Sequence, residues 1–337
     1  MNEQKLWGIV LAAGEGTRVR DFLVQLCGGR GIKQFCAVVG RRSLLEHTLA
    51  RVERLIPRER ILIVVSPRHR EEVEQQLAHW PADNIIYQPA NRDTAPGILL
   101  PLAHVSHRDP CATVAIFPSD HFILQEAQFM AAVGRAAVEA QRFPREMILL
   151  GMTPDRAEEG YGWIEPGIEE VGRETRAVQR FWEKPSLTHA QELLARGALW
   201  NTFVVVAWAP ALWEMVRQEA PNLYQAFTEI RQALGKPHVP LVTERVYQTL
   251  RAVNFSSDVC EPLAPWLRVL PVPEVGWSDW GNVERICDAL QQLGKMDDAV
   301  QCALSAVRAS QKGEECPRLL GERTVLRLGV ARASERP

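Results

Sequence analysis

The segment LWGIVLAAGEGTR, residues 6–18, decides the fold. It opens with a nearly continuous apolar run, residues 6–12, and ends in a turn that contains Gly14, Gly16 and Arg18. An apolar run of this length is typical of a strand buried on both faces of a parallel sheet. Glycines let a backbone approach a ligand closely, and successive N–H groups in such a turn can bind phosphate oxygens. Because an arginine can add a charged hydrogen-bond fork, we expect an anion site at the end of this strand.

The turn differs from the two best-known phosphate-binding motifs. It has no GxxxxGK[ST] pattern, and Val19 stands where GxGxxG requires its last glycine. Lys33 brings a second cation onto the same loop system. A plain strand-to-loop turn with solvated cations is the alternative interpretation, and the clustering of two glycines and an arginine directly after the strand favours the anion site.

Strand and helix patterns alternate through the first half of the chain. Ser43 and Glu46 form a capping-box pattern, and Thr94 is predicted to cap a later helix. This alternation predicts an α/β fold with a doubly wound, mostly parallel sheet, in which ligands bind beyond the carboxyl ends of the strands. The predicted strands are residues 61–65, 85–87, 113–117 and 147–150, and the predicted helices are the one that starts at the capping box and those over 68–79, 94–105 and 127–141.

The second half is less regular. A strand pair is predicted at 160–165 and 178–183, followed by a helix at 188–196 that Gly197 ends. A strand is predicted at 199–207, three helical patterns lie within 210–250, and an extended segment follows at 267–275. We divide the chain into one domain over residues 1–294, with halves at about 1–150 and 151–294, and a C-terminal extension of unknown role over residues 295–337.

Composition excludes several classes of protein. The 337 residues are 46% hydrophobic and 24% charged, which excludes a disordered chain, and the net charge of -2 gives no strong field toward nucleic acid or a membrane surface. No apolar stretch approaches the ~18–20 residues that span a bilayer, and the N-terminus has no signal-peptide pattern. The seven cysteines include no CxxC pair, which fits a reducing compartment. We therefore expect a cytoplasmic protein that binds neither nucleic acid nor membrane.

An ordered set of motifs makes a resemblance specific. In chain order they are LAAGEGTR (11–18), KQF (33–35), QPANRDTAP (88–96), FPSDH (117–121), GYG (160–162), EKP (183–185), WN (200–201) and GWSD (276–279). This set resembles the sugar-1-phosphate nucleotidyltransferases, above all their mannose-1-phosphate guanylyltransferase branch, over roughly residues 5–293.

The resemblance implies an enzyme that joins a sugar-1-phosphate to the α-phosphorus of an NTP and releases pyrophosphate. For this branch the implied partners are GTP and mannose-1-phosphate, the implied cofactor is Mg²⁺, and a homodimer is the assembly to test. It also makes residues 1–150 the nucleotide-binding half and residues 151–294 the sugar-phosphate-binding half. Because the attacking phosphate is already an anion, such chemistry needs positioning and positive charge rather than a general base.

The resemblance also implies roles for individual residues. The catalytic residues would be Arg18, Lys33, Asp120 and Lys184, and the metal ligands would be Asp120 and Asp279. The nucleotide-binding residues would be Ala12, Ala13, Gly14, Gly16, Thr17, Gln88, Arg92 and Thr94, and the sugar-phosphate-binding residues would be Gly162, Glu183, Lys184 and Asn201.

Each of these roles has a structural alternative. Asp120 could cap the next segment, Asp279 could be a turn residue, and Lys184 could be an exposed strand-end lysine. Arg92 could support its loop or contact the nucleotide.

Four residues depart from the family pattern: Ile32, Asp93, Phe203 and Ser256. The loop between Arg18 and Lys33 is also a few residues longer than in the closest relatives. These departures leave open another NTP and hexose-1-phosphate pair, or a catalytically weak member that binds nucleotide sugars. A GT-A-type glycosyltransferase is a third candidate, but FPSDH carries a single carboxylate instead of the Asp-x-Asp of that class.

Overall fold

The computed structural model describes residues 5–312. Its strands are β1 (Leu6–Ala12), β2 (Ile61–Val65), β3 (Ile85–Tyr87), β4 (Thr113–Pro118), β5 (Phe122–Ile123), β6 (Met147–Met152), β7 (Gly162–Pro166), β8 (Arg176–Glu183), β9 (Leu199–Trp208), β10 (Leu267–Val272) and β11 (Trp277–Ser278). Its α-helices are α1 (Arg20–Cys27), α2 (Leu44–Val52), α3 (Arg70–Gln76), α4 (Thr94–Arg108), α5 (Glu126–Arg142), α6 (Leu187–Ala195), α7 (Ala209–Glu219), α8 (Pro221–Ala233), α9 (Val239–Thr249), α10 (Val283–Gln292) and α11 (Asp298–Lys312).

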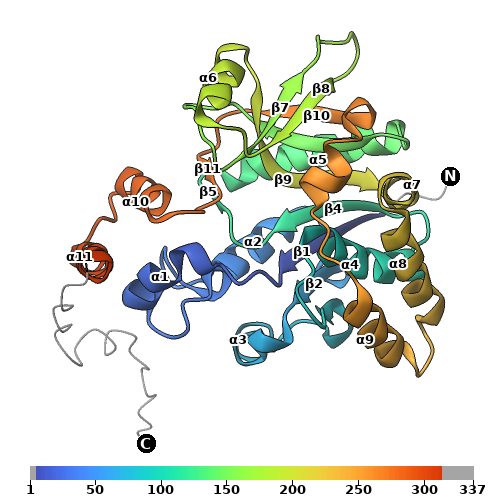
Figure 1. The fold of residues 1–337 in the computed structure, drawn as a ribbon, viewed down its shortest axis with the longest axis horizontal. Coiled ribbons are helices and arrows are strands. Elements are labelled where there is room, and N and C mark those ends of the chain that lie inside the picture. The colour runs from blue at the N-terminus through green and yellow to red at the C-terminus, as the bar shows by residue number, and fades with distance from the viewer. Residues whose placement is uncertain (1–4, 313–337) are drawn as a thin grey trace, which may run out of the picture.

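A large sheet runs through the centre of the molecule in the order β3-β2-β1-β4-β9-β6-β10-β8-β7 (Figure 1). The strands β3, β2, β1 and β4 are parallel, as is the pair β6 and β10. The α/β class is therefore confirmed, with a difference in the second half. There β9 runs antiparallel between β4 and β6, and β7 pairs antiparallel with β8, so the sheet is mixed. An apolar strand reads the same in either direction, which is why the pattern of β9 could not reveal this.

Helices cover both faces of this sheet (Figure 1). Neighbouring residues of β1 alternate between the two apolar cores: Ile9 packs with α4, α7 and α8, and Val10 packs with α2 and α5. This alternation is the period-2 geometry of a strand, and burial on both sides is the reason that β1 is a continuous apolar run. The β1 strand is thus packed between two layers of helices up to the residue before the turn.

The starts of α2 and α4 test two caps that were predicted from local sequence. The capping box before α2 is confirmed, because the Ser43 Oγ accepts a hydrogen bond from the Glu46 N–H at 3.1 Å and the Glu46 carboxylate accepts one from the Ser43 N–H at 2.7 Å. The prediction that Thr94 caps α4 is wrong. Asp93 is the N-cap, and the Thr94 Oγ1 instead accepts a hydrogen bond from the N–H of Phe255 at 2.7 Å. A distant segment has taken the hydroxyl that a local interpretation assigned to the cap.

The end of the described chain packs back onto the N-terminal half. Helix α11 lies against α1 (Figure 1), and Val300 and Ala303 join Phe22 and Leu23 in a third apolar core. Residues 313–337 of the predicted extension lie outside the described residues, and the division of the chain into domains stays a prediction. Between residues 5 and 312, the structure has no helix with the length and apolarity needed to cross a bilayer.

Candidate active site

The glycine-rich turn after β1 is held in shape by the segment that contains Lys33. Gln34 is buried, and its Nε2 donates to the carbonyl oxygens of Ala12 at 2.9 Å and of Gly14 at 2.8 Å. Gly16 has φ 57°, and a Cβ there would lie 2.9 Å from the Cβ of Lys33. Any other residue at Gly16 would therefore be strained and would collide with Lys33. The glycine turn and the Lys33 segment form one unit.

Lys33 joins the two predicted metal ligands. Its side chain is only 5% exposed, and its Nζ donates to Oδ2 of Asp120 at 2.9 Å and to the backbone carbonyl oxygen of Asp279. A buried ammonium needs compensating charge and hydrogen bonds, which these two residues supply. The structure therefore brings Lys33, Asp120 and Asp279 together at the carboxyl ends of β1 and β4.

A short pairing explains why Asp120 and Asp279 meet. Strand β5 pairs antiparallel with β11, with Ser278 opposite Phe122. Since antiparallel partners continue one for one, Asp279 continues β11 beside His121, the neighbour of Asp120. The Trp277 indole strengthens this junction by donating to Nδ1 of His121 at 3.3 Å.

Arg285 fixes the carboxylate of Asp279. It is 4% exposed, and its Nη1 donates to Oδ1 of Asp279 at 2.7 Å, while its Nη2 pairs with Glu158 at 2.5 Å. The guanidinium also lies 4.1 Å from the ring centroid of Tyr161, in the GYG motif. Arg285 thus links Asp279 to the loop before β7.

The charges at this centre are unequal. Burial is the largest influence on Asp120 and raises its pKa, but the charge and hydrogen bond of Lys33, together with His121 and a backbone hydrogen bond, more than offset it, so the pKa lies below its usual range. Burial lowers the pKa of His121 to about 4, which leaves this imidazole neutral at pH 7. The centre therefore presents the ionised carboxylate of Asp120 beside the neutral imidazole of His121.

The predicted nucleotide loop, residues 88–94, lies at the start of α4. Gln88 is 3% exposed; its Nε2 donates to the carbonyl oxygen of Ala90 at 2.7 Å, and its Oε1 has no hydrogen-bond partner among the residues that the structure describes. Arg92 donates from Nε to the carbonyl oxygen of Tyr247 at 3.0 Å, which is the loop-supporting contact. The contact with Tyr247 therefore anchors this loop, and the Oε1 of Gln88 remains available as an acceptor.

The predicted sugar residues lie together around β7, β8 and β9. A Cβ on Gly162 would lie 3.1 Å from Oε2 of Glu183 and 3.3 Å from the Cβ of Asn201. Lys184 follows with its side chain 55% exposed, and its Nζ pairs with Oε1 of Glu183 at 2.8 Å. These side chains supply a carboxylate, an amide and an ammonium beside a glycine that leaves room for a close ligand.

Positive φ angles at residues other than glycine gather in these motifs. Among the described residues they are Asp93 (68°), Lys184 (50°), Phe203 (60°) and Trp280 (48°). Each has a motif neighbour: Asp93 precedes Thr94, Lys184 follows Glu183, Phe203 lies two residues after Asn201, and Trp280 follows Asp279. Backbone strain of about 1–3 kcal/mol per residue is typically tolerated where function requires it.

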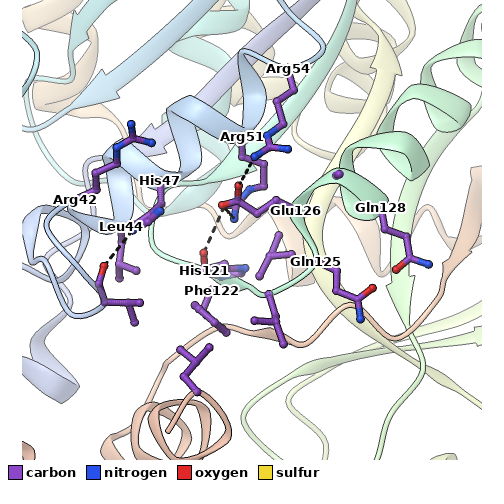
Figure 2. Close-up of a pocket in the computed structure, with 15 residues that line it drawn as sticks. Arg42, Leu44, His47, Arg51, Arg54, His121, Phe122, Gln125, Glu126 and Gln128 are labelled. Carbon is purple, nitrogen blue, oxygen red and sulfur yellow. Dashed lines mark hydrogen bonds and ion pairs between the residues drawn. The ribbon is translucent and has the colours of Figure 1, made fainter. Parts of the chain in front are cut away.

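A cavity of about 660 Å³ lies behind the His121 segment, between α2 and the start of α5 (Figure 2). Arg51 and Glu126 line it and point toward each other, with 3.5 Å between Arg51 Nη1 and Glu126 Oε1 (Figure 2). Arg51 also donates to Oγ1 of Thr48 at 2.8 Å, and that hydroxyl donates to the carbonyl oxygen of Ser119 at 3.2 Å. Helix α2 thus supports the residue before Asp120 from outside the site.

A comparison with protein families identifies the chain. The family described as Nucleotidyl transferase matches residues 7–296. The chain belongs to this family.

The chain is similar to several curated and solved proteins. It is 31% identical to the xanthan biosynthesis protein XanB of Xanthomonas campestris over 293 residues, which cover 85% of this chain and 60% of that protein. It is 30% identical to a mannose-1-phosphate guanylyltransferase of Salmonella muenchen over 294 residues, 84% of this chain and 59% of that protein. The chain therefore spans about 60% of the length of these curated relatives. A solved structure from Thermus thermophilus, described as mannose-1-phosphate geranyltransferase, matches at 26% identity with TM-score 0.73 and covers 84% of this chain and 79% of that chain.

The donor set of this candidate site fits a hard divalent cation. Lys33 uses Oδ2 of Asp120 and Arg285 uses Oδ1 of Asp279, so these cations leave the second oxygen of each carboxylate unused. No group of three or more His, Cys, Asp or Glu residues arranged to hold a metal occurs within residues 5–312. Two carboxylates suit Mg²⁺, which keeps several waters and binds substrate phosphates.

Sequence reasoning missed three residues of the candidate site. Gln34 lies inside the KQF motif, so the motif itself was the available signal, whereas Glu158 and Arg285 stand in no motif and gave none. Each of the four residues that depart from the family pattern has a different structural environment. Ile32 is buried, Asp93 caps α4, Phe203 packs against Phe255 with 6.5 Å between ring centroids, and the Ser256 N–H donates to Oδ1 of Asn254 at 2.9 Å.

Proposed function

We propose that this chain transfers a guanylyl group from GTP to mannose-1-phosphate, forming GDP-mannose and pyrophosphate. The observation that carries the proposal is the cluster of Lys33, Asp120 and Asp279 beside the glycine turn, in a chain of the nucleotidyl transferase family. The curated relatives named above include a mannose-1-phosphate guanylyltransferase, which supports the choice of substrates.

The reaction is an attack of the sugar phosphate on the α-phosphorus of the NTP. Because the nucleophile is an anion, the barrier is repulsion between anions together with charge that develops on the departing pyrophosphate. In our assignment Arg18 and Lys33 bind the triphosphate, and the backbone of residues 12–17 binds its phosphates through N–H groups. Lys184 holds the attacking phosphate, so catalysis is positioning plus neutralisation.

Mg²⁺ would be held by the second oxygens of Asp120 and Asp279 and would supply positive charge at the phosphates. Arg285 keeps the Asp279 carboxylate oriented, and Thr48 holds the backbone before Asp120. The first contact restricts the Asp279 carboxylate, and the second restricts the backbone from which Asp120 extends, which is the preorganisation that charge stabilisation requires.

Base recognition would use the residue 88–94 loop. The unpaired Oε1 of Gln88 can accept a hydrogen bond from the N1 or N2 donors of guanine. Adenine lacks this donor face, and a buried acceptor left unpaired costs about 1–3 kcal/mol. Thr94 and Arg92 hold the loop through contacts to Phe255 and Tyr247. In the sugar half, Gly162, Glu183 and Asn201 would receive the hydroxyls of a hexose.

The proposal is tested with purified protein, the four NTPs and several sugar-1-phosphates, with pyrophosphate release as the measurement. We expect GTP with mannose-1-phosphate to have the highest kcat/KM. A better rate with UTP or dTTP and glucose-1-phosphate, by about tenfold or more, would make the specificity wrong and leave the nucleotidyl transfer intact. Binding of a nucleotide sugar without turnover would favour the second candidate, a catalytically weak family member that binds nucleotide sugars. The departures at Asp93 and Phe203 motivate this candidate.

Lys184 gives the prediction that separates the two substrates. Replacing Lys184 by Met removes the ammonium and keeps most of the side-chain length, so one charge-assisted contact of about 1.5–3 kcal/mol is lost. We expect the KM for mannose-1-phosphate to rise by about 10–100-fold, with a much smaller change in the KM for GTP. Steady-state kinetics with each substrate varied in turn measures both values. Equal increases for the two substrates would contradict the assignment, and Lys236→Met, an exposed lysine, is the control.

The remaining expectations follow from the function. The cytoplasm is the compartment in which nucleoside triphosphates are supplied to such a reaction, and we propose it as the location. A homodimer stays a prediction, to be checked by light scattering.

A further inference from the structure

Two cysteines bracket the loop that carries Lys33. Helix α1 ends at Cys27, and the chain then reverses through the segment 28–32 and reaches Cys36 directly after the Lys33–Phe35 turn. Gly31 makes the reversal tight: it has φ 62°, and a Cβ there would lie 2.6 Å from Cγ2 of Val24. This is the loop that is longer than in the family pattern, and the proposed function assigns it no role.

The reversal brings the two thiols together. The Cys27 Sγ donates to the carbonyl oxygen of Ala37, the residue after Cys36, at 3.8 Å, which places the Cys27 thiol against the backbone beside Cys36. Cys27 is exposed and Cys36 is buried, and neither is in a disulfide. An exposed thiol can meet an oxidant from solution, and the buried thiol beside it can complete a disulfide.

We propose that Cys27 and Cys36 form a reversible disulfide that switches the nucleotide site off, with a low-molecular-weight disulfide as the oxidant. The switching part rests on the proposed function, whereas the disulfide itself does not.

The chemistry is thiol–disulfide exchange in two steps. The Cys27 thiolate attacks one sulfur of the small disulfide, forming a mixed disulfide and releasing one small thiolate. The Cys36 thiol then loses its proton to solvent and attacks Sγ of Cys27, forming the Cys27–Cys36 bond and releasing the second small thiolate. The two cysteines lose two electrons and two protons in all, and the small disulfide becomes two thiols.

The two thiols differ in how readily they ionise. The neighbouring Cys36 side chain lowers the pKa of Cys27 and outweighs the burial that raises it. The neighbouring Cys27 side chain, with burial, raises the pKa of Cys36 above its usual range. Cys27 is therefore the thiol that ionises first, and it is also the exposed one.

Formation of the bond would disturb Lys33 and Gln34. In the reduced structure the Cys36 Sγ donates to the carbonyl oxygen of Ile32 at 3.2 Å, and the Cys36 N–H donates to the carbonyl oxygen of Lys33 at 3.1 Å. A bond from Cys36 to Cys27 requires Sγ to leave Ile32 and pulls on the turn that Cys36 closes. Because Lys33 holds Asp120 and Gln34 holds the glycine turn, this movement reaches both parts of the phosphate site.

The disulfide is read directly by peptide mapping. Trypsin cleaves after Arg30 and Lys33, so Cys27 and Cys36 fall in different peptides, residues 21–30 and 34–41. The full chain is incubated with oxidised glutathione, free thiols are alkylated, and the digest is analysed without reduction. We expect one species with the summed mass of the two peptides less two hydrogens, which reducing agent removes. Failure to find this species at an oxidant level that modifies Cys27 would overturn the proposal.

Activity and hydrogen exchange read the switch. We expect oxidation to lower kcat/KM by about tenfold or more, since displacements of about 1 Å in a catalytic group have effects of that size, and reductant to restore it. Cys27→Ser should keep the reduced activity and resist oxidation, whereas Cys111→Ser, which removes another exposed cysteine, should respond like the original chain. A cross-linked chain with unchanged activity would refute the switch. If the reduced chain has no turnover, the proposed function is wrong, and the disulfide is then tested by hydrogen exchange alone. Faster amide exchange in residues 28–36 after cross-linking would show that the disulfide displaces the loop, and unchanged exchange would show that it does not.

Discussion

Asp120→Asn is expected to lower kcat with GTP and mannose-1-phosphate by about 10²–10⁴-fold, the loss typical of a removed metal contact in a charge-dominated reaction. The amide oxygen can still accept the hydrogen bond that Lys33 now donates to Oδ2 at 2.9 Å, so the fold around the site is retained. What disappears is the negative charge that would hold the divalent cation. Steady-state kinetics over a range of Mg²⁺ concentrations measures the loss and the change in metal requirement.

Asp279→Asn should behave in the same way, because its carboxylate is the second ligand of the same proposed metal. Arg285 keeps Glu158 as a partner at 2.5 Å, so the substitution does not strand a buried guanidinium. Asp288→Asn is the matched control: it removes an acid that is 51% exposed and pairs with Arg156 at the surface, and it should leave kcat unchanged. If Asp120→Asn and the control gave the same kcat, the metal assignment would be wrong.

Lys33→Met is expected to reduce kcat/KM for GTP by about 10²–10³-fold, which corresponds to roughly 3–4 kcal/mol. The substitution keeps the volume of a side chain that is 5% exposed, but it removes the donor to Asp120 and to the Asp279 carbonyl. Asp120 is then a partly buried carboxylate without its cation, and the triphosphate loses one of its positive contacts. Lys236→Met, which changes an exposed lysine, should have no effect on kcat/KM.

The same variant makes a signed prediction about pH. Lys33 now holds the pKa of Asp120 below its usual range against the burial that raises it. Without the ammonium, burial remains and the pKa of Asp120 rises. Activity that needs the ionised carboxylate should therefore begin to fall at a higher pH in Lys33→Met than in the original chain. An unchanged acid limb of the kcat/KM profile would show that Lys33 does not control Asp120.

Local patterns were sufficient for much of the fold. The apolar run of β1, its glycine turn and the capping box of α2 each lie within a few neighbouring residues, and the structure has them where the sequence predicted them. The motif KQF also identified the segment that holds the turn. Short-range signals of this kind come from burial periodicity and from hydrogen bonds between near neighbours, which any single sequence displays.

Which residues meet in the candidate site depends on contacts between distant segments of the chain. Residues 121 and 277, 156 positions apart, touch only because the two-residue strands β5 and β11 pair, and strands that short leave no periodic signal. The same holds for Arg285, whose partners Asp279 and Glu158 lie on different segments, and for β9, whose apolar residues would be equally buried in either direction. The sequence alone determined the α/β class, the glycine-rich turn after β1 and the family resemblance, because these depend on local pattern. Only the tertiary structure decided that Asp120 and Asp279 meet at Lys33, because that depends on pairing between distant segments.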